Sequence, residues 1–257
     1  MKIFRLIGMA LLAVCMNFAS CSSDDEESIK NDDGVITNQK LLVELRMTDE
    51  DGVSIIEYSY DSKGKLLSAN RDGREYTITW GANKIIESGN RDAITYTLED
   101  GLITHTSDRD GGDLENATFT YNANKQLIKL QYSENEYAAY IWQGEKLTKM
   151  TWKFSDEDIY ELSYSGNTCK SYLPIMVWNV DDLHPLLEAH PELVGMRCNQ
   201  LPDKVYSKDE DFESTSKYTY TFDKDGYVES CTEISTYKRL DINETRTETI
   251  IYTFKWE

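Results

Sequence analysis

The chain has 257 residues and carries 46 Asp and Glu against 27 Lys and Arg, which gives a formal net charge of −19 at pH 7. A surface of this sign repels DNA, which binds through Lys and Arg that neutralise its phosphates, and it also repels anionic lipid headgroups. The composition therefore excludes nucleic acid as a partner, and the charge is typical of a surface that keeps a protein in solution.

The first twenty residues have the layout of an export signal. Lys2 and Arg5 give a positive start, residues 6–18 are mostly apolar, and two small residues stand directly before Cys21. The apolar run is shorter than the ~20 residues that a transmembrane helix needs. The segment that ends at Cys21 resembles a lipobox, in which the cysteine thiol is acylated and becomes the new N-terminus. We therefore expect residues 1–20 to be a lipoprotein signal peptide, with an ordinary signal peptide cut elsewhere as the alternative.

Residues 21–34 predict an acidic disordered tether. Ser, Asp, Glu, Asn and Lys dominate the segment after Cys21, so it has little to bury. Serine and acidic residues in this position resemble the surface-export signals of Bacteroides-type lipoproteins. The resemblance implies a protein that is anchored by lipid in the outer membrane and faces outward.

Residues 35–257 predict one all-β domain. Aromatic and aliphatic side chains alternate with threonine in segments such as 76–80, 118–121, 218–222 and 252–256. This alternation is typical of half-buried strands. Short turns rich in Gly, Asn and Asp separate the strands, and these residue types tolerate the positive φ of tight hairpins. We expect an antiparallel meander of repeated hairpins that forms a curved sheet or a barrel.

The hairpins repeat with a regular period. The last core-facing residue before each turn recurs every 18 to 23 residues, at Tyr60, Trp80, Leu98, Tyr121, Trp142 and Tyr164. Stacked units of this kind bury one continuous core. The segments 58–66 and 220–228 are the clearest copies, and they are similar to the tyrosine-aspartate repeats of secreted β-repeat shells.

The spacing of the hairpins over residues 40–256 is more similar to that of another family. The similarity includes the segment 199–205, where the chain returns to strands after the irregular segment. The family is one of Bacteroides-type lipoproteins known as a domain of unknown function with a porin-like fold (domain of unknown function 4595). The resemblance implies a barrel-like domain and assigns no catalytic residues. The strands are shorter than the ~10 residues of membrane porin strands and carry threonine and charge at alternate positions. We therefore expect a porin-like but soluble domain.

One segment, at about residues 174–202, breaks the alternation and predicts a helical insert. Asp181 or Asp182 is placed to cap a helix, and Pro185 is tolerated in its first turn. Leucines and valine follow, at Leu183, Leu186, Leu187, Leu193 and Val194, and they suit a plug or lid on an open end of the sheet. A structural cap and a ligand gate both fit this pattern, and Trp178 is the candidate ligand contact.

No sequence motif for catalysis or cofactor binding is present, so no catalytic residue, cofactor or metal is predicted. His184, Glu188 and His190 lie close together, but a zinc site needs three or four ligands with suitable geometry. The acidic segment 108–113 lacks the ligand spacing of a calcium loop. Cys169 and Cys198 bracket the insert and are candidates for a disulfide bond.

Three functional hypotheses follow from these patterns. The first is a non-catalytic protein of the cell surface that binds an unknown extracellular ligand, a glycan or a peptide. The second is a structural or assembly component of the envelope. The third is a hydrolase that uses paired carboxylates, although 46 acidic residues will form pairs by chance.

Overall fold

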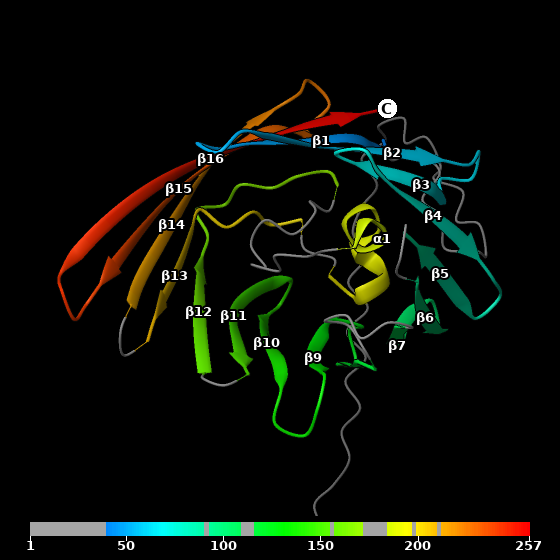
Figure 1. The fold of residues 1–257 in the computed structure, drawn as a ribbon, viewed down its shortest axis with the longest axis horizontal. Coiled ribbons are helices and arrows are strands. Elements are labelled where there is room, and N and C mark those ends of the chain that lie inside the picture. Colours follow the sequence, from blue (N-terminus) through cyan, green and yellow to red (C-terminus); the bar gives the residue numbers. More distant parts are fainter. Residues whose placement is uncertain are drawn as a thin grey trace, which may run out of the picture.

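The computed structural model describes residues 40–89, 93–108, 116–154, 157–171, 184–196, 199–209 and 212–257. These residues form sixteen strands, one short α-helix and one 3-10 helix (Figure 1). The strands are β1 (Leu42–Thr48), β2 (Val53–Tyr60), β3 (Leu66–Arg71), β4 (Arg74–Trp80), β5 (Lys84–Ser88), β6 (Ala93–Glu99), β7 (Leu102–Asp108), β8 (Thr118–Tyr121), β9 (Leu127–Gln131), β10 (Tyr137–Gln143), β11 (Lys146–Lys153), β12 (Glu157–Ser163), β13 (Lys204–Lys208), β14 (Phe212–Phe222), β15 (Val228–Arg239) and β16 (Glu244–Trp256). The helices are α1 (Pro185–Ala189) and η1 (Pro191–Val194).

The strands form a closed antiparallel barrel in which each strand pairs with its neighbours in sequence. β1 and β16 close the ring, with Leu42 opposite Trp256. Leu41 and Glu257 extend this pairing and exchange both backbone hydrogen bonds, at 2.6 and 2.9 Å. The predicted all-β meander is confirmed, and the sheet that the sequence left as curved or barrel-like is a barrel.

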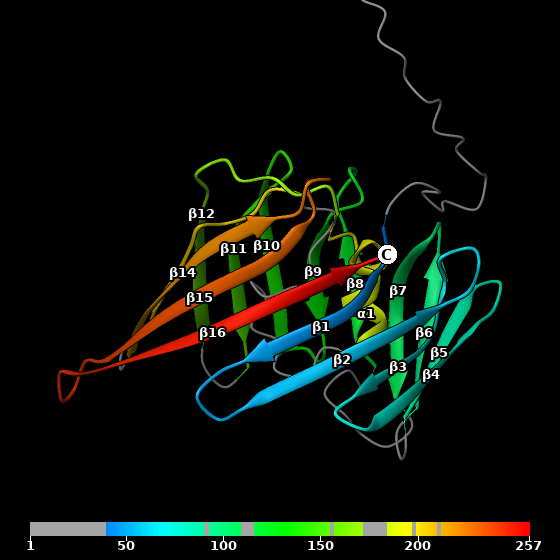
Figure 2. The same ribbon diagram turned by 90° about the horizontal axis from the view of Figure 1, so that it is seen from above.

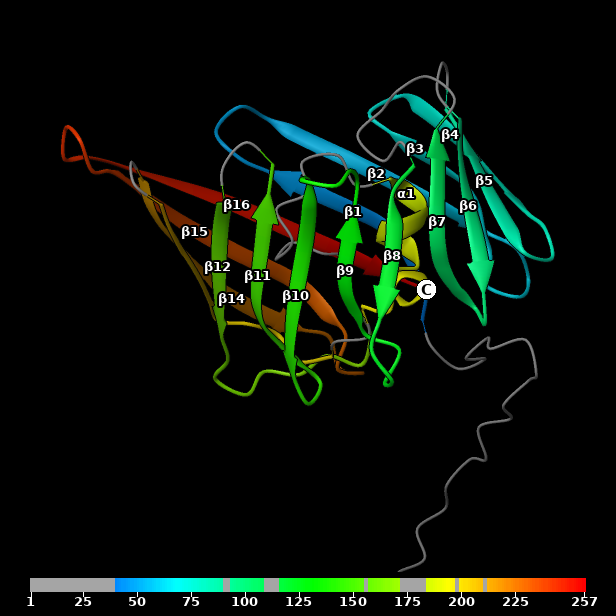
Figure 3. The same ribbon diagram turned by 90° about the horizontal axis from the view of Figure 1, so that it is seen from below.

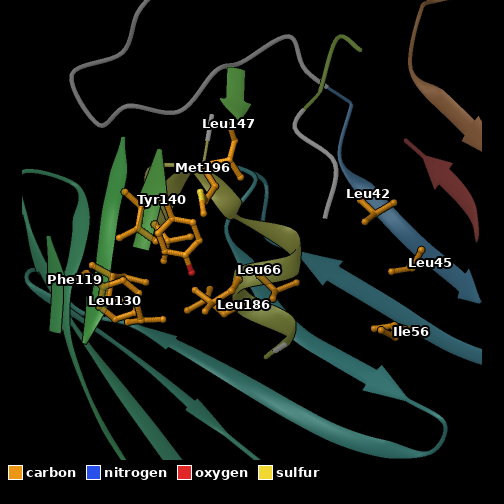
Figure 4. Packing of buried hydrophobic residues seen from close by; sticks show 14 of the residues in the cluster. Leu42, Leu45, Ile56, Leu66, Phe119, Leu130, Tyr140, Leu147, Leu186 and Met196 are labelled. Carbon is orange, nitrogen blue, oxygen red and sulfur yellow. The ribbon is translucent and has the colours of Figure 1, made fainter. Parts of the chain in front are cut away.

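The core lies inside the barrel because the period-two alternation turns one face of every strand inward. The strands contribute buried aliphatic and aromatic side chains, among them Leu66, Phe119, Leu130 and Tyr140. Figure 4 shows Leu186 of α1 between Leu66 on one side and Leu130 and Tyr140 on the other. The insert therefore completes the core, since Leu186 has no exposed surface.

A set of side-chain hydrogen bonds at one rim explains the repeat period. At seven of the eight hairpins, the terminal Tyr or Trp of one strand donates to a backbone carbonyl at the start of the preceding strand. The pairs are Tyr60–Leu42, Trp80–Leu66, Tyr121–Ile103, Trp142–Leu127, Tyr164–Leu147, Tyr220–Pro202 and Trp256–Val228. In each case the acceptor lies two residues beyond the last backbone pair of those strands.

These aromatic residues therefore continue the ladder by one bond where neighbouring strands separate. A carbonyl without a partner is costly in a buried setting, so a donor is favoured there over a purely apolar side chain. Leu98 is the exception. At that hairpin the strand pairing continues up to Lys84 opposite Thr97, next to Leu98, and the Leu98 N–H donates to the Asn83 carbonyl at 2.8 Å.

Three turns at the same rim share one geometry. Asp61, Asn122 and Asp223 each accept backbone N–H bonds from the residues two and four positions later. The third residue after each of them, Gly64 in the first turn, has positive φ, which glycine adopts without strain. The aspartate of the repeat is thus a turn residue.

The two helices of the insert, α1 and η1, lie inside the barrel in the ribbon views, between the β1–β2 side and the β8–β9 side (Figures 1, 2 and 3). Pro185 lies in the first turn of α1, as predicted, but it is the first residue of that helix, so the expected cap at Asp181 or Asp182 is wrong. His184 is the N-cap residue and makes no side-chain cap hydrogen bond, while Asp181 and Asp182 lie outside the described residues. Gly195 ends η1 with φ of 67°, where a β-carbon would collide with the Lys125 carbonyl of the β8–β9 turn.

β14, β15 and β16 are the longest strands, with 11, 12 and 13 residues. β1 pairs with β16 only from Ile251 to Trp256, so the part of β16 from Glu244 to Ile250 runs past the end of β1. Figures 2 and 3 show these three strands projecting beyond the rest of the barrel.

Candidate functional site

Several residues singled out in the sequence lie outside the described residues, namely Cys21, Trp178 and Cys198, as does most of the acidic segment 108–113. Cys169 is described and buried, and its Sγ accepts the N–H of Ser171 at 3.4 Å. Burial raises the pKa of the Cys169 thiol. Lipidation of Cys21, the ligand contact at Trp178 and the Cys169–Cys198 disulfide remain predictions.

Glu87 of β5 holds the start of the insert helix. Alternation places its side chain on the same inward face as Ile85, and only 2% of its surface is exposed. The carboxylate accepts the backbone N–H of Leu186 at 3.1 Å and lies 3.1 Å from Nδ1 of His184. The Tyr96 hydroxyl completes the set at 3.4 Å. A side chain of the barrel wall thus satisfies a helix N–H that the helix's own N-cap residue leaves without a partner.

Glu188 of α1 fastens the same helix to β2 and β3. Its carboxylate lies 2.6 Å from the Arg71 guanidinium and 3.0 Å from the Tyr58 hydroxyl. Burial raises the pKa of Glu188, and the positive charge of Arg71 opposes that rise. Burial and the adjacent Glu188 also raise the pKa of Tyr58 well above its usual value, so its hydroxyl remains a donor.

The three residues considered as zinc ligands turn to different partners. His184 faces Glu87, Glu188 faces Arg71, and His190 contacts Glu192 at 2.8 Å. The Leu66 N–H lies 3.3 Å from Nε2 of His190, and the imidazole packs edge-on to Trp80. In the described ranges there is no group of three or more His, Cys, Asp or Glu that could hold a metal ion.

A second buried carboxylate of the barrel wall, Glu233, lies on the inner face of β15. It accepts hydrogen bonds from Tyr218 at 3.2 Å, from Ser235 at 2.8 Å and from Tyr252 at 3.1 Å. These donors come from β14, β15 and β16, which places the cluster in the wall of the barrel. Burial, followed by the charge of Glu233, raises the pKa of the neighbouring Cys231 thiol to about 12, so this thiol stays protonated and unreactive at neutral pH.

The outer face of the same three strands is rich in hydroxyl groups, and it includes one exposed charge at its middle, Lys217 of β14, which lies opposite Ile234. Outward positions alternate with the buried ones, and from β14 to β16 they carry threonine, serine and isoleucine: Thr219, Thr221, Ser230, Thr232, Ile234, Thr236, Thr247, Thr249, Ile251 and Thr253. We call this set the threonine face. Ile234 and Ile251 are 44% and 43% exposed and lie on adjacent strands. Such a face offers hydroxyl groups and methyl groups in a molecule that is otherwise strongly acidic.

Sequence reasoning identified neither buried carboxylate. A signal for Glu87 was present, because it stands two residues after Ile85 on the core-facing register of its strand. Glu233 likewise shares a register with Cys231. The arrangement inside the barrel holds the insert and the wall together, whereas the threonine face is open to a partner.

No helix within the described part of the chain is long and apolar enough to cross a membrane.

Comparison with known proteins supports the fold. The family described as a domain of unknown function (DUF4595) with porin-like fold matches residues 77–230. A crystal structure of a porin-like protein from Bacteroides uniformis ATCC 8492 is similar with a TM-score of 0.66 at 19% sequence identity, over 83% of this chain and 98% of that chain. At this identity the likeness concerns the fold alone. Among curated proteins no match was found.

Proposed function

Because this chain belongs to the family of domains of unknown function with a porin-like fold, we propose that it is a lipid-anchored envelope protein that binds an extracellular ligand and performs no catalysis. The proposal locates the binding surface on the threonine face of β14–β16. The filled interior of the barrel then serves as the rigid support for that face.

The distribution of exposed apolar side chains carries this proposal. Ten large apolar side chains of the described residues are exposed, and six of them belong to β14–β16 or the turn between β15 and β16: Phe212, Phe222, Ile234, Tyr237, Ile242 and Ile251. Of these six, Ile234 and Ile251 lie on the threonine face, whereas Phe212 and Tyr237 share the register of the buried Tyr218 and Glu233 and lie on the other face of the sheet. Exposed apolar groups that gather on one side of a molecule mark an interaction surface. The remaining barrel strands do not concentrate them in this way.

The chemistry of the threonine face favours a neutral ligand. A net charge of −19 repels anionic ligands over most of the surface. The ten residues of the threonine face include no carboxylate that would attract a cation, and the charged group beside them is Lys217, opposite Ile234. Hydroxyl groups beside methyl groups suit a neutral glycan or an uncharged extended peptide, since both present hydrogen-bonding groups and apolar patches.

A binding screen with a matched pair of variants tests the proposal. The full chain is applied to arrays of neutral glycans, anionic glycans and peptides, and binding is expected among the neutral probes. Ile234→Glu places a charge in the centre of the threonine face and is expected to abolish that binding. Ile141→Glu on β10, where the isoleucine is 54% exposed, is the control and is expected to bind like wild type. Equal binding by both variants, or turnover of the bound probe, would contradict the proposal.

The anchoring part of the proposal is supported by the layout around Cys21 and is compatible with the Bacteroides source of the similar structure. Cys21→Ser is expected to remove fatty-acid label and to release the protein from the membrane fraction. Unchanged label and unchanged membrane recovery in this variant would contradict it.

A further inference from the structure

The part of β16 from Glu244 to Ile250 has an open edge. β15 pairs with it along its whole length, while β1 ends opposite Ile251. An open strand edge presents rows of backbone N–H and C=O groups that can pair with another strand. Seven residues of such an edge, projecting beyond the barrel, make a surface suited to adding a strand (Figure 2).

The register of the barrel identifies which backbone groups face this edge. Leu41 and Glu257 exchange both of their backbone hydrogen bonds, so the odd-numbered residues of β16 direct their N–H and C=O toward the β1 side. On the open part of the strand these residues are Thr245, Thr247 and Thr249. All three are exposed.

The sequence of this edge is complementary to itself. If a second copy pairs antiparallel about a two-fold axis at Thr247, that residue meets its own equivalent and Thr245 meets Thr249 of the second copy. Each of these three pairs is of the hydrogen-bonded type, in which two residues exchange two bonds. Arg246 then lies opposite Glu248 of the second copy, twice, at the non-hydrogen-bonded positions where side chains are closest.

Neighbouring registers lose this complementarity. An axis at residue 246 places Arg246 opposite its own equivalent, and an axis at residue 248 does the same for Glu248. Like charges directly opposite each other destabilise a strand pair. The acidic residues near the two ends of the edge already have cationic neighbours, since Asp241 contacts Arg239 and Glu50 contacts Arg246.

We propose that this protein forms a two-fold symmetric dimer in which β16 of one copy pairs antiparallel with β16 of the other, centred on Thr247. The two sheets become continuous across the axis, as in a closed two-fold interface where the same patch serves both copies. Within one chain Arg246 already contacts Glu248 at 2.9 Å and also Glu50, so in the dimer these charges exchange or share partners across the axis, and a strand with like charges at the two positions would repel them. The proposal does not depend on the ligand-binding function.

Charge reversal tests the register directly. The full chain, purified with its anchor in detergent, is studied by sedimentation equilibrium, and wild type is expected to dimerise. Arg246→Glu and Glu248→Arg are each expected to weaken the dimer roughly 10- to 100-fold, because two attractive pairs become two repulsive ones. A 1:1 mixture of the two variants is expected to recover the wild-type affinity as a heterodimer, since one chain is then acidic and the other basic at both positions.

The mixture also shows whether a variant has lost dimerisation or has failed to fold, because a misfolded variant would not form a heterodimer with the other variant. Glu50→Gln is the control, since it removes one of the two intramolecular ion pairs of Arg246, keeps the pair with Glu248 and leaves the edge intact, and it is expected to dimerise like wild type. A monomeric wild type at micromolar concentration, charge variants that still dimerise, or a mixture that stays monomeric would each overturn the proposal.

Discussion

The wall formed by β2–β5 and the wall formed by β14–β16 both contain a buried carboxylate, but the two groups are held differently. Glu87 and the nearby Arg71 bind the insert, so their partners come from another part of the chain. Glu233 is held by hydroxyl groups of its own wall. The first wall therefore depends on the insert for its stability, whereas the second is held together by its own cluster and keeps its outer face open.

The largest loss of unfolding free energy is expected from a substitution in the first wall, the one formed by β2–β5. Arg71→Met leaves the buried Glu188 carboxylate without its cation, and such a change is expected to cost about 3 to 5 kcal/mol of unfolding free energy at neutral pH. Chemical denaturation measures this cost.

The unfolding free energy of the same variant, Arg71→Met, is also expected to depend on pH. Burial already raises the pKa of Glu188 above its unfolded value of 4.5, and loss of Arg71 raises it further. The folded state then binds the proton more tightly than the unfolded chain, so the unfolding free energy of Arg71→Met is expected to rise as the pH falls toward 4.5. If the difference in unfolding free energy between wild type and Arg71→Met is equal at pH 7.5 and pH 5, Glu188 is not the affected group.

A smaller effect is expected in the second wall. Tyr218→Phe removes one of three donors to Glu233 and leaves the other two, for an expected loss of about 1.5 kcal/mol. Because no contact with the insert is involved, hydrogen exchange at the Leu186 N–H, which is bonded to Glu87, is expected to proceed at the wild-type rate. Faster exchange would show that the second wall also holds the insert.

A rim bond is expected to contribute about 1 kcal/mol to stability. Trp142→Phe keeps the ring and deletes the donor to the Leu127 carbonyl. Leu98→Phe is the control, because that hairpin uses a backbone bond in place of a side-chain donor. Thermal unfolding of the two variants compares them, and equal losses would mean that ring size matters and the hydrogen bond does not.

The smallest effect concerns acid stability. Lys40, and then the Tyr227 N–H, lower the pKa of Asp223 from 3.8 to about 2. A lowered carboxyl pKa stabilises the folded state above pH 3.8, and this contribution is lost as the pH falls toward 2. Asp223→Asn retains the turn, as Asn122 shows in its own hairpin, and is expected to remove this part of the acid sensitivity. Lys40→Met should have the same effect, and an unchanged profile in both variants would contradict it.

The sequence predicted the elements that depend on local chemistry. Alternation located the strands, Asp61 and its equivalents located the turns, and the aromatic period marked one rim of the barrel. Pro185 was correctly placed in the first turn of the helix, although the predicted cap at Asp181 or Asp182 lies too early in the chain. These features depend on the residues of a single hairpin or turn, so they can be read along the chain.

The contacts between distant strands could not be predicted in this way. Closure of β1 on β16 requires that fifteen strand-to-strand steps add up to a full turn, and no single residue encodes it. In the sequence Glu87 cannot be told from a glutamate on the surface. Its role in holding the insert helix appears only in the contact with the N–H of Leu186, which is far along the chain. The threonine face and the open edge of β16 likewise follow from the unequal lengths of neighbouring strands.

The closing pair of strands also has a kinetic consequence. Hairpins join nearby residues and form within microseconds, and each rim aromatic acts within one hairpin. The joint between β1 and β16 connects opposite ends of the domain, and such distant contacts slow folding. Until that joint forms, β1 and β16 both have free edges, and the folding chain is most exposed to aggregation in that interval.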